Sequence, residues 1–163
     1  MISNVRVVMD TNVIVSAALL PRSVPRQVFD RALEHGTVLI SSATVAELND
    51  VLRRPHFDKY VHEDERLEFF ATLVRDAELV VVNDVVTDCR DPKDNKFLKL
   101  ALSGKATHIV SGDEDLLALH PFRGVLILMP QAFAMGRTRG ARSPRQPGIE
   151  GNLMEVAAMR ASS

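Results

Sequence analysis

Cysteine is nearly absent from this sequence of 163 residues, where Cys89 is the only one. A single thiol excludes an internal disulfide framework and is typical of a protein from a reducing cytoplasm. We therefore expect a cytoplasmic protein in which Cys89 is an inert loop thiol.

Long hydrophobic runs are missing as well. No apolar stretch approaches the roughly 20 residues of a membrane-spanning helix, and the first residues lead into a strand pattern without the successive segments of a secretory signal. We expect neither a membrane anchor nor a signal. The composition, 46% hydrophobic and 25% charged, is that of an ordinary globular domain, and the length suits one domain with a single core.

A strong excess of one charge is also lacking, because the formal net charge is −1. The charges are nevertheless uneven: residues 137–163 hold five arginines and two glutamates, so this segment carries +3 and residues 1–136 carry −4. Its Gly, Pro, Ser and Arg content is typical of linkers. We expect one folded domain over residues 1–136 and a flexible basic extension over 137–163 with a short helix. Docking of a partner and contact with nucleic acid stay open as roles for it.

Short apolar strands alternate with helix-period segments along the first 136 residues, which predicts an α/β fold built from βαβ units with a parallel sheet. In the helix expected over 63–76, the inward residues should be Leu67, Phe70, Leu73 and Val74. We expect strands at 5–10, 37–41, 78–82, 107–111 and 124–129, and helices at 12–20, 24–35, 42–54, 63–76 and 92–103, with short helices beginning near 114 and at 130.

Four acidic residues fall where predicted strands end or where the following helices begin. Asp10 ends the first strand and Asp113 lies just past the fourth. Asp94 falls in the first turn after the third strand, and Glu47 early in the helix after the second. Because the carboxyl ends of parallel strands and the amino ends of the following helices share one edge of a sheet, these four side chains can converge there.

Bringing four carboxylates together costs electrostatic free energy, which another group must offset. Two carboxylates about 4 Å apart repel by roughly 4 kcal/mol at an effective dielectric of 20, whereas a helix amino terminus offsets only about 0.3–1 kcal/mol. A divalent cation is the simpler remedy, and oxygen donors without histidines at zinc spacing favour Mg²⁺ or Mn²⁺. Because such ions polarise phosphoryl oxygens and activate water, the pattern indicates phosphodiester hydrolysis.

Each acid also has an interpretation that needs no metal. Asp10 and Asp91 can be helix caps, and Thr44 with Glu47 matches a capping box. Asp94 and Asp113 can be solvated acids near helix starts. The catalytic hypothesis therefore depends on the joint placement of the acids, since no single one carries it.

Four successive segments resemble the blocks of a PIN domain of the VapC-like group, the toxin components of toxin–antitoxin pairs. They are "MDTNVIVSAAL", "SSATVAELNDVLRRPHF", "RDPKDNKFLKLALSGKATHIVSGDEDLLAL" and "GVLILMPQAF", and together they cover about residues 5–135. The resemblance implies a three-layer α/β/α sandwich with a central, mainly parallel five-stranded sheet. The extension over 137–163 lies outside this pattern.

The resemblance also implies an activity, that of an endoribonuclease that uses one or two Mg²⁺ or Mn²⁺ ions to hydrolyse single-stranded or looped RNA. It further implies a homodimer and a small antitoxin protein as partners. Asp10, Glu47, Asp94 and Asp113 would be the catalytic, metal-binding acids, Thr11 and Asn12 polar groups beside the metal, and Asp91 and Asp115 auxiliary acids. For contact with RNA we look to cations near predicted helix ends, namely Arg22, Arg26, Arg53, Arg54 and Lys59.

Three other functions can be compared with the same residues. An aspartyl-phosphate phosphatase needs a second aspartate two residues after the nucleophile, where this chain has Asn12. A phospho-acceptor receiver domain needs an aspartate at the end of the third strand, where Val82 runs into Asn83. A catalytically silent module that binds RNA or a protein partner stays open as the alternative.

Overall fold

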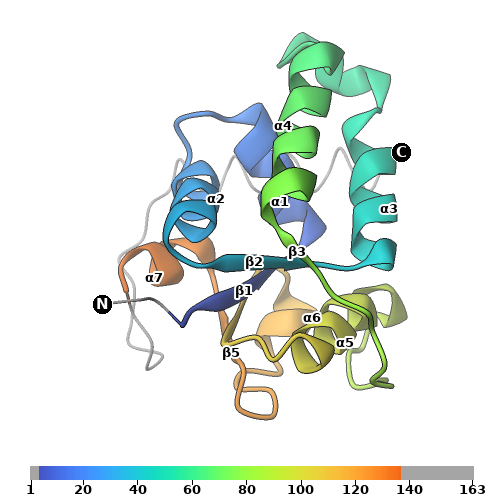
Figure 1. The fold of residues 1–163 in the computed structure, drawn as a ribbon, viewed down its shortest axis with the longest axis vertical. Coiled ribbons are helices and arrows are strands. Elements are labelled where there is room, and N and C mark those ends of the chain that lie inside the picture. The colour runs from blue at the N-terminus through green and yellow to red at the C-terminus, as the bar shows by residue number, and fades with distance from the viewer. Residues whose placement is uncertain (1–3, 137–163) are drawn as a thin grey trace.

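The computed structural model of the protein describes residues 4–136, and a five-stranded parallel sheet lies at its centre (Figure 1). The strand order is β3-β2-β1-β4-β5, and every neighbouring pair is parallel. The predicted α/β fold with its five-stranded sheet is confirmed, whereas the predicted extension over 137–163 lies outside the described residues. The strands are β1 (Arg6–Met9), β2 (Thr37–Ile40), β3 (Glu78–Leu79), β4 (His108–Val110) and β5 (Leu126–Leu128).

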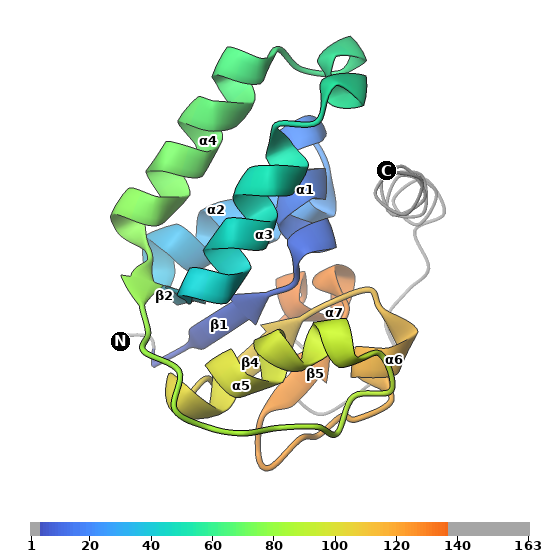
Figure 2. The ribbon, with the colours of Figure 1, turned by 90° about the vertical axis from the view of Figure 1, so that its right-hand side faces the viewer.

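Helices cover both faces of the sheet (Figure 2). Alternate residues of a strand point to opposite faces, so Val7 and Val38 pack with α1–α4 while Val8 and Ile109 pack with α5 and α6. None of the helices in residues 4–136 is both long enough and apolar enough to span a bilayer. The helices are α1 (Thr11–Leu19), α2 (Val24–His35), α3 (Ser42–Leu52), α4 (Glu63–Asp76), α5 (Asn95–Ser103), α6 (Glu114–Leu117) and α7 (Pro130–Ala134), with 3₁₀ turns η1 (Pro55–Lys59) and η2 (Pro92–Asp94).

The strand order reverses at β1. The chain leaves β1 toward β2 and β3 on one side, and it returns to place β4 and β5 on the other side. Open parallel sheets bind their ligands in the crevice at such a switch point, outside the carboxyl ends of the two central strands. In this chain, that crevice lies beyond Met9 of β1 and Val110 of β4, which pair with each other.

Strand β3 is shorter than the predicted 78–82. Its partner β2 ends at Ile40, and the chain then turns into α3, so the hydrogen bond of 2.8 Å from the Val80 amide to the Ile40 carbonyl is the last between them. Val81 therefore has no strand to pair with and is 77% exposed. Farther along this loop, Cys89 is buried, and burial raises the pKa of its thiol, in line with its interpretation as an inert loop thiol.

Helix α4 has the predicted bounds, but its inward face differs from the prediction. Leu73 is buried as expected, whereas Val74 is 41% exposed, so its predicted inward position is wrong. The inward face instead includes Arg66, which is 1% exposed and lies two turns before Leu73. One residue is 100° of helix rotation, so Val74 cannot share the face that Arg66 and Leu73 define.

Candidate active site

Asp10 lies at the switch point and is held by both central strands. It follows β1 directly, and its backbone amide donates to the Val110 carbonyl of β4 at 3.1 Å. Its carboxylate is 4% exposed, caps α1 by accepting from the Val13 amide at 2.9 Å, and accepts a second bond from the Ser111 hydroxyl. Asp10 is therefore a helix cap, as one interpretation of the sequence held, and also a buried charge at the crevice.

Ser111 connects Asp10 to Asp113. While its hydroxyl donates to Asp10, the same oxygen accepts from the Asp113 amide at 2.9 Å. The Asp113 carboxylate caps α6, where its Oδ1 accepts from the Asp115 amide at 3.1 Å. Ser111 is fully buried and was not among the predicted site residues. Its position directly after a core strand, next to a predicted acid, was the available signal.

Asp94 completes a group of three acids. It is 5% exposed, forms a side-chain hydrogen bond with Asp113, and lies at the junction of η2 and α5. Burial above all raises the pKa of Asp94 to about 8, and the hydrogen bond and charge of Asp113, then the charges of Asp91 and Asp10, act in the same direction. These effects all favour the protonated form of the Asp94 carboxyl beside Asp113.

Glu47 lies beside this group and has different partners. Its Oε1 accepts from the Thr11 hydroxyl, and its Oε2 lies 3.5 Å from Lys96 Nζ. The interpretation of Glu47 as a capping-box residue is wrong, because Ser41 and Thr44 form the capping box of α3, one turn before Glu47. Lys96, in the first turn of α5, is a cation at the site that the sequence analysis missed.

The remaining predicted polar residues lie around these acids. Asp91 caps η2 by accepting from the Lys93 amide at 3.0 Å, and Asp115 forms an ion pair with Arg90 at 3.0 Å. Both auxiliary acids thus have partners of their own. Asn12 differs, since its Oδ1 is buried without a hydrogen-bond partner among residues 4–136.

The chemistry of these side chains suits a hard divalent cation, because the atoms that could bind it are all oxygens. One of them, Asn12 Oδ1, is buried without a hydrogen-bond partner in the described part of the chain. Within the described range, no group of three or more His, Cys, Asp or Glu side chains has a geometry that could hold a metal ion as it stands. Asp94 and Asp113 instead form a side-chain hydrogen bond with each other, and the raised pKa of Asp94 favours its protonated form. A metal ion would have to displace that proton.

The predicted RNA-binding cations are not brought to the acids. Arg22 and Arg26 follow the far end of α1, whereas Arg53, Arg54 and Lys59 follow the far end of α3. A helix of 9–11 residues is about 13–16 Å long, which is the separation to expect from the crevice. Arg26 also forms an ion pair with Asp30 in its own helix, and Arg54, just past the end of α3, pairs with Asp50 of that helix. RNA contact by these five residues stays a prediction.

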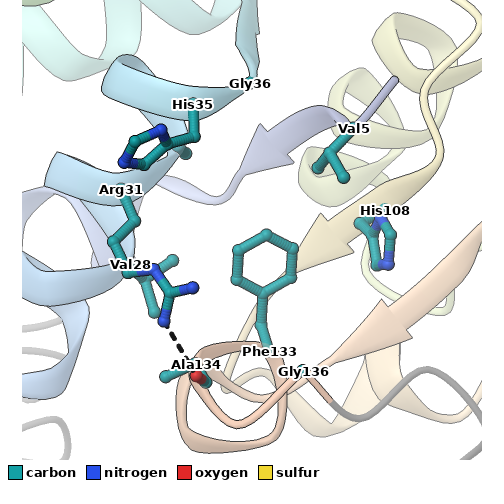
Figure 3. Close-up of a pocket in the computed structure, with 10 residues that line it drawn as sticks. Val5, Val28, Arg31, His35, Gly36, His108, Phe133, Ala134 and Gly136 are labelled. Carbon is teal, nitrogen blue, oxygen red and sulfur yellow. Dashed lines mark hydrogen bonds between the residues drawn. The ribbon is translucent and has the colours of Figure 1, made fainter. Parts of the chain in front are cut away.

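A separate pocket of about 200 Å³ lies at the opposite edge of the sheet (Figure 3). Val5 and His108, at the amino ends of β1 and β4, line it together with Phe133, and Arg31 donates to the Ala134 carbonyl at 3.3 Å. The predicted acids do not line this pocket. Its apolar walls and its position therefore give it no part in chemistry at the carboxylates.

The pKa of Asp94 predicts how the stability of the metal-free protein depends on pH. Because folding raises this pKa from its ordinary value to about 8, the contribution of Asp94 is fully present below about pH 4 and is lost as the pH rises through 8. With EDTA present, we expect wild type and Asp94→Asn to melt at similar temperatures at pH 4.5 and to diverge toward pH 9, with wild type lower. A difference that does not change with pH would contradict the buried, protonated carboxyl.

A family model described as PIN domain matches residues 6–115. The uncharacterized protein MJ1680 of Methanocaldococcus jannaschii is 32% identical over 117 residues, which is 71% of this chain and 75% of that protein.

Two solved structures have a similar fold. One is VapBC2 from Rickettsia felis bound to a DNA fragment from their promoter, with a TM-score of 0.51 and 13% identity over 75% of this chain and 96% of that chain. The other is PAE2754 from Pyrobaculum aerophilum, with a TM-score of 0.51 and 14% identity over 96% of this chain and 99% of that chain. At these identities, the likeness shows the fold alone.

Proposed function

Because the chain belongs to the PIN-domain family, we propose that it is a Mg²⁺- or Mn²⁺-dependent endoribonuclease and the toxin component of a toxin–antitoxin pair. One observation carries the catalytic part of this proposal. Asp10, Asp94 and Asp113 come from three separate junctions of the chain and form one acidic group at the switch point of the sheet, in which Asp10 and Asp94 are buried and Asp113 is half-buried.

In this proposal Asp10, Asp94 and Asp113 would hold one or two ions, with Asp94 deprotonated, and Glu47 would complete or orient the set of ligands. Such an ion supplies electrostatic stabilisation of the phosphoryl oxygens and a lower pKa for water. Ser111 keeps Asp10 oriented and also fixes the Asp113 backbone. Thr11 holds Glu47 beside the group, and Lys96 balances the charge of Glu47.

The proposed partners follow from the family and from one structural neighbour. We propose a small antitoxin protein that keeps the nuclease inactive, a homodimer of this chain, and RNA as the substrate in the cytoplasm. The VapBC2 structure supports an antitoxin only through similarity of fold. Co-purification with the product of an adjacent small gene would be the direct check of that partner.

A specific observation favours the second candidate, a catalytically silent module that binds RNA or protein. The acids have partners within the chain, since Asp94 forms a side-chain hydrogen bond with Asp113 and Lys96 pairs with Glu47. A site whose acids have such partners can persist without turnover. Only a measurement of cleavage separates a nuclease from such a module.

The deciding experiment incubates purified protein with a structured and an unstructured RNA, in Mg²⁺, in Mn²⁺ and in EDTA. We expect cleavage with either ion and none in EDTA, because the acids compensate for one another only through a proton or a cation. Asp94→Ala, purified in the same way, is the control for contaminating nucleases. Cleavage that persists in EDTA or in Asp94→Ala would refute the assignment, and a lack of cleavage under all conditions would favour the silent module.

A further inference from the structure

A groove of about 460 Å³ adjoins the acidic group at the same edge of the sheet. It lies between the first turn of α3, the chain that leaves β3, and the exposed side of α5. The green chain after β3 runs on toward α5 in Figure 2. The lining residues are Ser41, Ser42, Ala43, Leu79, Val80, Val81, Val82, Lys96 and Lys99.

One side of the groove is apolar and unusually exposed. Leu79 is 63% and Val81 is 77% exposed, which places them among the most exposed large hydrophobic side chains in residues 4–136. They are exposed because β2 ends at Ile40 and leaves the chain after β3 without a neighbouring strand. This side therefore offers flat apolar contact to a ligand.

The other side is cationic. Lys96 and Lys99 lie one turn apart on α5, and residues three apart on a helix share a face. Lys96 reaches Glu47 at 3.5 Å, which joins the groove to the acidic group. In the described part of the chain, Lys99 has no hydrogen-bond or ion-pair partner.

The first turn of α3 adds donors to this cationic side. The amides of Ser42 and Ala43 have no intrahelical acceptor, because they open an 11-residue helix. Both residues are exposed, and no acidic residue stands in the first turn. Such a terminus favours an anion, and the two lysines place further positive charge next to it.

We propose that this groove binds single-stranded RNA beside the catalytic acids, with phosphates on Lys96, Lys99 and the start of α3 and a base against Leu79 and Val81. The inference rests on the proposed function and deepens it, since it names a substrate subsite. A nucleotide supplies an anion and a flat apolar face together. An apolar peptide would leave the lysines and amides buried without partners, at a cost in free energy.

The groove also accounts for how an acidic domain can hold a polyanion. The acids are concentrated in the crevice, where a cation can neutralise them, whereas no acidic side chain lines the groove within residues 4–136. The five cations predicted from the sequence lie a helix length away. The two sets of cations therefore predict different paths for the RNA.

The test measures binding of a fluorescein-labelled, unstructured RNA of about 12 nucleotides to the full chain by anisotropy, in EDTA so that turnover does not contribute. We expect Lys99→Ala to weaken binding about fivefold and to lower the slope of log K against log salt by about 0.7, the value for one lost phosphate contact on a single strand. Val81→Ser should weaken binding about twofold without a change in slope, because it removes a contact with no charge.

Lys59→Ala is the matched control, since it removes one lysine from the distant set. Wild-type binding by Lys99→Ala, or an equal loss in Lys59→Ala, would overturn the inference, as would a lack of RNA binding by the wild type. Circular dichroism checks the fold of each variant. If Lys99→Ala weakens binding but Mg²⁺ gives no cleavage, the inference that the groove binds RNA is supported and the proposed nuclease function is refuted.

Discussion

Asp94→Asn is expected to slow Mg²⁺-dependent RNA cleavage about 100-fold or more, because losing a ligand for a divalent cation removes several kcal/mol of transition-state stabilisation. The same change should raise the melting temperature of the metal-free protein. An amide is neutral without a proton, whereas burial above all, and then the neighbouring acids Asp113, Asp91 and Asp10, raise the pKa of the Asp94 carboxyl to about 8.

The expected stabilisation at pH 8 is at most about 5 kcal/mol, because the pKa of Asp94 rises by about four units at about 1.4 kcal/mol each. For a chain of this size, each 1 kcal/mol raises the melting temperature by about 2–4 °C. Loss of activity together with a gain in stability identifies a functional acid, because a structural residue would lose both. The matched control is Asp88→Asn, which changes an exposed acid of the preceding loop that pairs with Arg123 at 3.5 Å. Equal effects of the two substitutions would remove Asp94 from the site.

Arg66→Met is expected to destabilise the protein by about 3–5 kcal/mol, because it removes a buried cation and leaves its acceptors unpaired. Arg66 Nε donates to the Leu52 carbonyl at 2.7 Å, and its other nitrogens donate to the Arg54 and Val61 carbonyls and to Asp58. These bonds fasten α4 to the end of α3 and to η1. Methionine has a side chain of similar length but no hydrogen-bond donor.

Arg75→Met provides the control on the same helix, because Arg75 is exposed and its ion pair is with its neighbour Asp76. We expect it to change the free energy of unfolding by less than about 0.5 kcal/mol in urea titrations. Arg66→Lys should fall between the two, since a single ammonium cannot reach all the carbonyls. An Arg66→Met protein as stable as Arg75→Met would show that the carbonyls find other donors.

The positions of the acids could be predicted from the sequence, because they depend on topology. Once Asp10 and Asp113 are placed after parallel strands, the geometry of the sheet brings them to one edge. Local signals also sufficed for two caps, since Asp10 accepts from the Val13 amide of α1 and Asp91 accepts from the Lys93 amide of η2. Features that depend on a few neighbouring residues, or on the order of strands along the chain, can therefore be predicted from one sequence.

Other features depend on contacts between distant segments, and the sequence pattern did not reveal them. From the sequence alone, Arg66 would be predicted to be a surface charge. In the fold, backbone carbonyls from the ends of α3 and η1 surround its guanidinium. Lys96 and Ser111 join the site only through partners far along the chain. The length of β3 was overestimated because its limit is set by where β2 ends.

The bond between Ser111 and Asp10 joins residues 101 positions apart. A nascent chain, or one whose β4 and β5 have detached, therefore holds the separate acids but has no assembled centre. The acidic group should consequently assemble late in synthesis and come apart when the sheet first opens cooperatively.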